Sequence, residues 1–200
     1  MSQGKFIVIE GPDGSGQTTQ ATLLSDSLTK ASKSVLLTKE PADELDGGLI
    51  RKILKGEHQV SPETLQLYFT ANRGYHLDAQ INPALEQGKW VVSDRYFFST
   101  FAFGMLEINY DWLWQINNKF PVPDLTFFLD VPANVCIDRI QRRGSDRELF
   151  EQEQKLDQVI KNYKKVFSKN QFPNVFIING NRDIGAIAKE IWGITSARLK

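Results

Sequence analysis

The hydrophobic positions of the chain gather in short runs that predict five β-strands. These runs are rich in β-branched and aromatic residues and end at polar or turn residues, as strands do. Their apolar character is nearly continuous rather than alternating, which is typical of strands covered on both faces in a parallel sheet. The predicted strands are residues 5–10, 34–39, 89–94, 125–131 and 174–179.

Segments with helical periodicity lie between these strands. Ser61 followed by Pro62 has the form of an N-cap with proline at the first helical position. The alternation of strands and helices predicts an α/β fold, in which helices flank a doubly wound, parallel, five-stranded sheet. Besides the helix that begins after Ser61, helices are predicted at residues 18–30, 132–142, 146–169 and 183–199.

Composition sets limits on the class of protein. The chain has 200 residues, 41% of them hydrophobic and 24% charged, which predicts a single globular domain over residues 1–200. Because 24 Lys and Arg balance 24 Asp and Glu, no basic excess favours nucleic acid or an anionic membrane. No apolar stretch approaches the ~20 residues of a membrane span, and the single Cys136 cannot form an intramolecular disulfide. We expect a cytoplasmic protein.

A glycine-rich motif follows the first predicted strand directly. Residues 11–18 read Gly-Pro-Asp-Gly-Ser-Gly-Gln-Thr, the spacing of a phosphate-binding P-loop. The glycines let the backbone wrap around a phosphate, with N–H groups and the positive end of the next helix directed at it. The alternative is a glycine-rich turn without a ligand. The motif favours a P-loop NTPase-type fold, and the predicted ATP-binding residues are Gly11, Gly14, Ser15, Gly16, Gln17, Thr18 and Thr19, with Thr18 also offered to Mg²⁺.

Gln17 stands where such loops carry a lysine. Its amide can donate a hydrogen bond to a phosphate oxygen but brings no positive charge. A unit charge at about 4 Å is worth on the order of 4 kcal/mol at an effective dielectric near 20. Three explanations stay open: arginines elsewhere replace the charge, the residue was substituted in order to trap the protein, or the chain binds nucleotide and barely turns it over.

Further blocks resemble a known family. Residues 6–16, 38–41 (Thr-Lys-Glu-Pro), 69–73 (Phe-Thr-Ala-Asn-Arg), 94–96 (Asp-Arg-Tyr) and 123–130 (Pro-Asp-Leu-Thr-Phe-Phe-Leu-Asp) occur in the order and spacing of thymidylate kinases. The resemblance covers nearly the whole chain. It implies transfer of the γ-phosphoryl group of ATP to dTMP, giving ADP and dTDP, with Mg²⁺ and usually in a homodimer.

Three residues are candidates for the chemistry. Asp94 and Arg95 end a predicted strand, at the edge where open α/β sheets bind ligands. The resemblance implies that Asp94 helps to hold hydrated Mg²⁺ and that Arg95 bridges the acceptor and transferring phosphates, a task that suits its planar fork. It also implies that Asp13 approaches the sugar 3′-hydroxyl and the acceptor phosphate. A structural Asp-Arg pair and an Asx turn are the alternatives.

The acceptor site is predicted around a helical pair. Phe69 and Arg73 lie four residues apart on a predicted helix and therefore point the same way. An aromatic face beside a cation can stack on a pyrimidine and donate to its carbonyl edge, whereas the alternative is a core Phe and a solvated Arg. The other acceptor-site residues that the resemblance implies are Glu40, Arg51, Arg95, Tyr96, Ser99 and Thr100.

Two connections differ in their expected roles. Residues 42–48 are acidic and glycine-rich and are expected to be an exposed connection. Residues 141–152 resemble the mobile lid that closes over ATP in the family, although a solvated connection is the alternative. In that lid, Arg143 or Arg147 can supply the charge that Gln17 lacks, and such an arginine is worth ~10³ to 10⁵ in rate.

Several positions depart from the family pattern. Gly104 stands where a glutamine often helps to read thymine, and Phe103 lacks the tyrosine hydroxyl that often screens out a ribose. The choices between thymine and uracil and between deoxyribose and ribose therefore stay open. His58, His76 and Cys136 are too isolated to predict a zinc site.

Two other functions remain alternatives to a thymidylate kinase. One is a nucleotide-binding protein with little or no turnover that acts through ligand-dependent dimer or partner contacts. The other is a kinase for another monophosphate or a deoxynucleoside. The presence of Asp13, Asp94, Arg95 and Arg147 together favours catalysis, because a binding module has no chemical need for all four.

Overall fold

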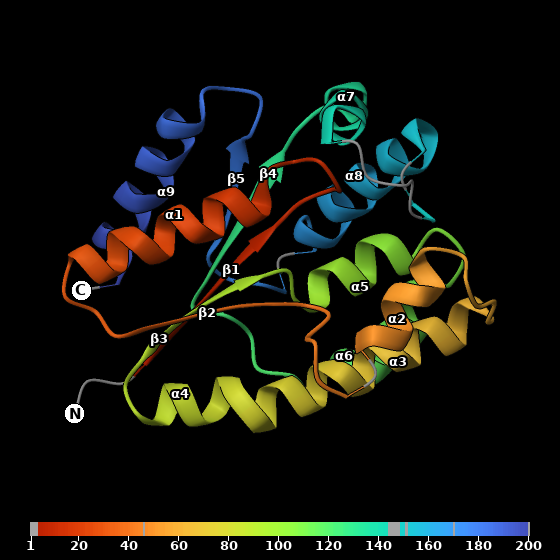
Figure 1. Cartoon of the computed structure of the whole chain (residues 1–200), viewed down its shortest axis with the longest axis horizontal. Coiled ribbons are helices and arrows are strands. Elements are labelled where there is room, and N and C mark those ends of the chain that lie inside the picture. Colours follow the sequence, from red (N-terminus) through yellow and green to blue (C-terminus); the bar gives the residue numbers. More distant parts are fainter. Residues whose placement is uncertain (1–3, 46, 144–148, 151, 170, 200) are drawn as a thin grey trace.

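The computed structural model describes residues 4–45, 47–143, 149–150, 152–169 and 171–199. Five parallel strands form one sheet, as the sequence predicts, and the structure gives their order as β2-β3-β1-β4-β5 (Figure 1). The strands are β1 (Lys5–Glu10), β2 (Val35–Lys39), β3 (Trp90–Asp94), β4 (Leu125–Asp130) and β5 (Val175–Asn179).

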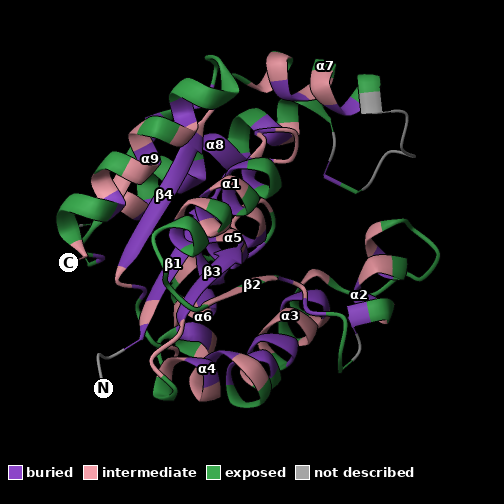
Figure 2. Cartoon of the chain, turned by 60° about the vertical axis from the view of Figure 1, so that its left-hand side comes forward, coloured by how far each residue is buried: buried purple, intermediate pink, exposed green. Residues whose placement is uncertain are grey.

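The three central strands are buried and the two outer strands are only partly so (Figure 2). Ile7 of β1 lies in register with Val92 of β3 and Leu125 of β4, and all three side chains are at most 1% exposed. Continuous apolar runs therefore mark strands that are covered on both faces. β2 and β5 have a neighbour on one side only, and Ile177 of β5 is 56% exposed.

Helices cover the two faces of the sheet in two groups. On one face, α1 (Gln17–Lys30) and α9 (Ile184–Arg198) pack against each other and bury their leucines and isoleucines on β1 and β4 (Figure 1). The aromatic core on the other face joins strand residues to five helical elements. These are the π-helix η1 (Leu77–Ile81), α4 (Asn82–Glu86), α5 (Phe97–Gly104), α6 (Tyr110–Asn117) and α8 (Glu153–Phe167).

The remaining helices lie toward the carboxyl ends of the strands. They are α2 (Gly47–Leu54), α3 (Pro62–His76) and α7 (Ala133–Arg143), and Figure 2 shows α2 and α7 well apart from each other. Ser61 caps α3 as predicted, since its hydroxyl accepts from Thr64 N at 3.2 Å. Within the described ranges, no helix is both long and apolar enough to cross a membrane.

One local expectation holds in part and another is wrong. Residues 43–45 and 48 are exposed, as expected for residues 42–48, but Ala42 and Gly47 are buried and α2 begins at Gly47. The helix expected over residues 146–169 begins only at Glu153. Phe150 packs instead with residues of α2 and α3 in a small apolar cluster, so this residue contacts a part of the chain that is distant in the sequence. Helical periodicity carries no information about such long-range packing.

Phe128 offers a test of the aromatic core. Its side chain is fully buried in β4, with ring centroids 4.8 Å from Tyr163 and 5.5 Å from Phe167. Phe128→Ala should lower the free energy of unfolding by about 3–5 kcal/mol, because it leaves a cavity in close-packed surroundings. Urea denaturation checks this. The control Ile177→Thr, at an exposed position that keeps a β-branched residue, should change it by less than about 0.5 kcal/mol; equal effects would contradict the assigned core.

Candidate active site

The glycine-rich loop curls between β1 and α1 and opens into a cavity of about 710 Å³. Gly14 and Gly16 have φ angles of 81° and 93°, in the left-handed region that favours glycine. A Cβ on Gly14 would lie 2.5 Å from the Cys136 carbonyl oxygen, so no larger residue fits there. The cavity is lined by the predicted residues Gly14, Ser15, Gly16, Gln17, Thr18 and Thr19, while Gly11 lies at the base of the loop.

Gln17 connects this loop to Arg95. Its carboxamide satisfies its neighbours when the nitrogen donates to Gly11 O at 2.9 Å and to Ser15 Oγ at 3.0 Å. The oxygen then accepts from Arg95 Nη2 at 2.5 Å and from Arg95 Nε at 2.6 Å. A lysine in this place would repel the guanidinium, whereas the neutral oxygen of Gln17 attracts it.

Arg95 is held in a strained conformation at the end of β3. Its φ of 75° is unusual for a residue with a side chain, and such strain concentrates at functional sites. The guanidinium donates to Gly11 O and Ser99 Oγ at 3.0 Å and pairs with Asp13 at 2.6 Å. Burial opposes the charge, but the neighbouring carboxylates, Asp13 foremost, raise the pKa of Arg95. The side chain therefore keeps a fixed positive charge beside the loop.

Asp94 and Thr18 meet beside the loop. Thr18 Oγ1 donates to Asp94 Oδ2 at 2.5 Å, and Asp94 Oδ1 is buried without a partner in the described residues. Burial raises the pKa of Asp94, and the charge of Arg95 and the Thr18 hydroxyl oppose that rise. The pair thus offers one hydroxyl and one unsatisfied carboxylate oxygen toward the cavity.

Glu10 is linked to Arg95 through Ser99, whose hydroxyl donates to Glu10 and accepts from Arg95. Sequence reasoning did not assign this role. The Glu10 carboxyl accepts from Tyr96 N at 2.9 Å, Ser99 Oγ at 2.7 Å and Tyr163 Oη at 2.8 Å. Burial raises the pKa of Glu10 to about 7, although the charge of Arg95 and these hydrogen bonds lower it. An acidic residue that ends a buried strand is the signal that could have drawn attention to it.

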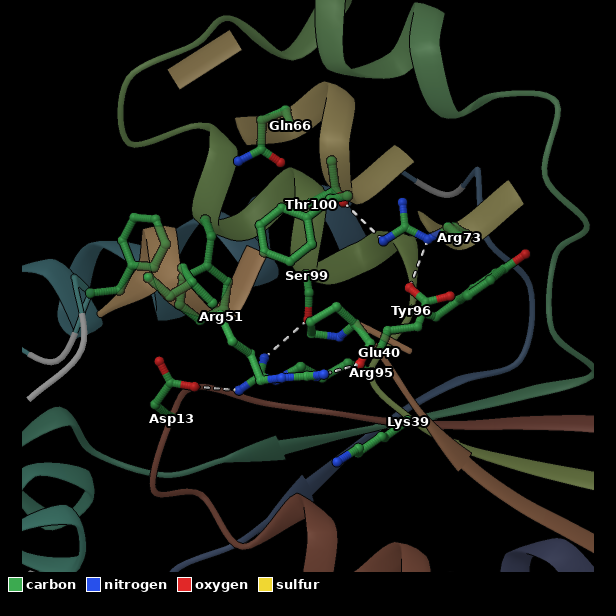
Figure 3. Close-up of a pocket in the computed structure, with 15 residues that line it drawn as sticks. Asp13, Lys39, Glu40, Arg51, Gln66, Arg73, Arg95, Tyr96, Ser99 and Thr100 are labelled. Carbon is green, nitrogen blue, oxygen red and sulfur yellow. Dashed lines mark hydrogen bonds and ion pairs between the residues drawn. The ribbon is translucent and has the colours of Figure 1, made fainter. Parts of the chain in front are cut away.

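Figure 3 shows a second cavity of about 240 Å³, which adjoins the first because the two have lining residues in common. Arg73 is 2% exposed and forms an ion pair with Glu40 at 2.8 Å, so the alternative of a solvated arginine is wrong. It also donates to Thr100 at 3.0 Å and Asn117 at 2.6 Å. The structure brings every predicted acceptor-site residue to this cavity: Glu40, Arg51, Phe69, Arg73, Arg95, Tyr96, Ser99 and Thr100.

Each end of this cavity carries an ion pair, Arg95 with Asp13 at one end and Arg73 with Glu40 toward the other. Figure 3 shows Asp13 and Arg95 at one end, and Gln66, Thr100 and Arg73 toward the other. Arg51 also lines the cavity and pairs with Asp43 at 2.7 Å. Asp13 and Arg95 also line the cavity at the glycine-rich loop, so their end of the smaller cavity is the end suited to a phosphate.

Sequence reasoning missed two further residues of the site. Arg139 of α7 donates to Ser15 O at 3.1 Å and to Gly180 O at 3.1 Å, and thereby ties the loop to the end of β5. The Asn72 carboxamide accepts from Ala42 N at 2.8 Å and donates to carbonyl oxygens of residues 42, 44 and 45. Both act through backbone atoms far away in the sequence, which no local pattern reveals.

Some predicted features lie outside the described residues. Arg147 lies outside the described residues, as does most of the expected lid over residues 141–152, and the side chain of Arg143 is not described. No group of three metal-ligating side chains occurs in the part of the chain that the structure describes. Cys136 is buried, and burial raises the pKa of its thiol to about 12, so it is not a reactive thiolate.

Comparisons with known proteins agree on one family. The family described as thymidylate kinase matches residues 9–191. A probable thymidylate kinase of Pyrococcus horikoshii is 38% identical over 203 residues, which cover 98% of each chain. A probable thymidylate kinase of Thermococcus gammatolerans is 37% identical, again over 98% of each chain. A thymidylate kinase of Carboxydothermus hydrogenoformans is 36% identical over 77% of this chain and 81% of its own.

The raised pKa of Glu10 predicts a pH dependence of stability. Its carboxyl titrates near 4.5 in the unfolded chain and near 7 in the folded chain, so folding favours the protonated form. This contribution is complete below pH 4.5 and is lost as the pH rises through about 7. Over that window the free energy of unfolding should fall by up to about 3 kcal/mol relative to Glu10→Gln.

Urea denaturation of both proteins between pH 4.5 and 8 measures this difference. The control Glu86→Gln, at an exposed position, should follow the parent chain at every pH. Parallel curves for the parent and Glu10→Gln would show that folding does not raise the pKa of Glu10.

Proposed function

Because the chain belongs to the thymidylate kinase family, and is therefore an ATP-dependent phosphotransferase, we propose that it transfers the γ-phosphoryl group of ATP to dTMP, giving ADP and dTDP. One observation carries this proposal. The two cavities share the lining residues Asp13, Lys39, Glu40 and Arg95. Two ligands seated in them would meet at Arg95, which is the arrangement that direct transfer between two phosphates requires.

The larger cavity suits the triphosphate. The loop and the first residues of α1 line this cavity, so their backbone amides would bind a phosphate there. Gln17 contributes hydrogen bonds but no charge. Arg95 is already in contact with Gln17, so we propose that its guanidinium replaces the missing ammonium beside the donor phosphates. Arg143 and Arg147 stay candidates for a further contribution from the lid.

The smaller cavity suits the acceptor. Phe69 would stack on the base, and Arg73 would donate to one of its carbonyl oxygens. Arg51 and Arg95 would hold the acceptor phosphate. Asp13 orients Arg95 through their ion pair. Tyr96, Ser99 and Thr100 line the same cavity and complete the proposed contacts to sugar and base.

Thr18 and Asp94 fit Mg²⁺. The ion prefers oxygen ligands and keeps several waters, and the pair offers a hydroxyl and a buried carboxylate oxygen that lacks a partner. When bound, the ion would neutralise charge on the donor phosphates. Thr18 and Asp94 would position it on the same side of the loop as Arg95.

Assembly and location remain proposals. Exposed Leu67 and Tyr75 lie two turns apart on α3 and form an apolar strip that is suited to a homodimer contact. The single domain over residues 1–200, the lid over residues 141–152 and the cytoplasmic location stay predictions.

An ADP-release assay with ATP, Mg²⁺ and a panel of nucleoside monophosphates tests the reaction. The parent chain should give its highest kcat/KM with dTMP. Arg95→Ala should lower kcat by ~10³ to 10⁵ with unfolding still cooperative, because the variant loses the cation between the two phosphates. Arg198→Ala, at an exposed residue of α9, is the control. Near-normal activity of Arg95→Ala would remove Arg95 from the mechanism, and binding of every candidate without turnover would support the alternative of a non-catalytic binding protein.

Substitution at position 17 tests the replacement of the lysine. If no cation were near the donor phosphates, Gln17→Lys would add about 4 kcal/mol of attraction, or nearly 10³-fold in rate. Because Arg95 is already there, we expect a gain below about tenfold. Gln17→Met removes the oxygen that holds Arg95 and should lower kcat by about 10- to 100-fold. A gain near 10³ for Gln17→Lys would mean that Arg95 does not compensate.

A further inference from the structure

Gln66 is a buried polar residue that no step above uses. It lies on α3, is 3% exposed and lines the smaller cavity. Its Oε1 atom is buried and has no hydrogen-bond partner, and none of the hydrogen bonds found in the described residues involves its carboxamide. A buried amide left unpaired costs about 1–3 kcal/mol. A ligand that donates a hydrogen bond to this oxygen removes that cost and therefore binds more tightly.

The carboxamide of Gln66 packs against Gly104, where the missing side chain leaves space for it. A Cβ on Gly104 would lie 3.3 Å from Gln66 Cδ and 2.9 Å from Leu113 Cδ2. Leu113 is fully buried and cannot easily move, so a larger residue at position 104 would press on the carboxamide. The observed position of the Gln66 carboxamide therefore depends on a glycine at position 104.

The position of Gln66 determines which part of a ligand it can meet. Asp13 and Arg95 lie at the other end of the cavity, where we place the acceptor phosphate (Figure 3). Gln66 lies toward the end that carries Thr100 and Arg73. A nucleotide with its phosphate at Arg95 would thus direct its base toward Gln66.

Arg73 and Gln66 offer different hydrogen-bonding groups to that base. Arg73 has only N–H donors, and three of its five are already directed at Glu40, Thr100 and Asn117. Gln66 adds an acceptor, the unpartnered Oε1. The edge of thymine or uracil presents a carbonyl, an N3–H and a second carbonyl, so it needs both a donor and an acceptor. Cytosine has no N3–H, and its amino group would face the donors of Arg73.

We propose that Gln66 is a specificity-determining residue whose Oε1 accepts the N3–H of a thymine or uracil ring while Arg73 donates to the adjacent carbonyl. This inference rests on the proposed function, because it takes the smaller cavity as the acceptor site. The pair selects an imide base over cytosine. Phe69 supplies stacking, which does not distinguish among pyrimidines.

Gln66→Met tests the assignment, since methionine has a similar size and no hydrogen-bonding amide. With dTMP, KM should rise about 10- to 100-fold and kcat should change little, because Gln66 contacts the base and not the reacting phosphates. The matched control is Gln87→Met, at an exposed glutamine after α4, which should leave both constants unchanged.

A base analogue separates recognition from a purely structural role. The 5′-monophosphate of N3-methylthymidine lacks the N3–H and places a methyl group against Oε1. The parent chain should prefer dTMP over this analogue by at least about 100-fold in kcat/KM, and Gln66→Met should reduce that preference tenfold or more. An unchanged preference would overturn the proposal.

Thermal unfolding gives a second readout. Gln66→Met removes an unpaired buried amide, so the unliganded variant should melt at the same temperature as the parent or above it. Saturating dTMP should then raise the melting temperature of the variant less than that of the parent. A lower melting temperature without ligand, together with an unchanged shift by dTMP, would assign Gln66 to the core alone.

The outcomes distinguish this inference from the proposed function. If the parent chain phosphorylates dTMP and Gln66→Met keeps its KM and base preference, the inference about Gln66 fails and the proposed function stands. If the parent chain neither binds nor phosphorylates any pyrimidine monophosphate, both fail.

Discussion

The contact between Arg95 and the phosphate-binding loop is the interaction on which the site depends. A single guanidinium touches Gly11, Asp13 and Gln17, and it does so from a backbone conformation that an arginine rarely adopts. Such a conformation costs on the order of 1–3 kcal/mol and persists only where the surroundings hold it. The ion pair with Asp13 and the buried carboxyl of Glu10 behind it supply that support. The chain thus places a fixed positive charge beside both cavities.

This arrangement explains why a glutamine at position 17 is compatible with a phosphate-binding loop. A lysine would bring its own charge to the donor phosphates and would repel a second cation in the resting site. Gln17 instead accepts from Arg95 and keeps that cation against the loop. One arginine can then serve both the donor and the acceptor, provided that it reaches both phosphates. Asp94 and Thr18, which are hydrogen-bonded to each other, would position the proposed divalent cation.

The sequence predicts the scaffold well because local patterns determine it. Continuous apolar runs mark the buried strands, and the glycine spacing places the loop between β1 and α1. The residues predicted for the acceptor site came from the family resemblance and line one cavity, and Phe69 and Arg73 face it together because they are one helical turn apart. The residues that the sequence analysis did not identify share one property. Phe150 and Arg139 act through partners that are distant in the sequence, and the pairing of Gln66 with Gly104 exists only once α3 and α5 are packed together.

A crystal structure with a dinucleotide in which five phosphates join adenosine to thymidine, in the presence of Mg²⁺, tests the central claim most directly. The account predicts that the Arg95 guanidinium lies within hydrogen-bond distance of a donor phosphate oxygen beside Gln17 while it also contacts the phosphate next to thymidine. A structure in which Arg95 touches only the thymidine side, with Lys39 or a lid arginine against the donor phosphates, would contradict it.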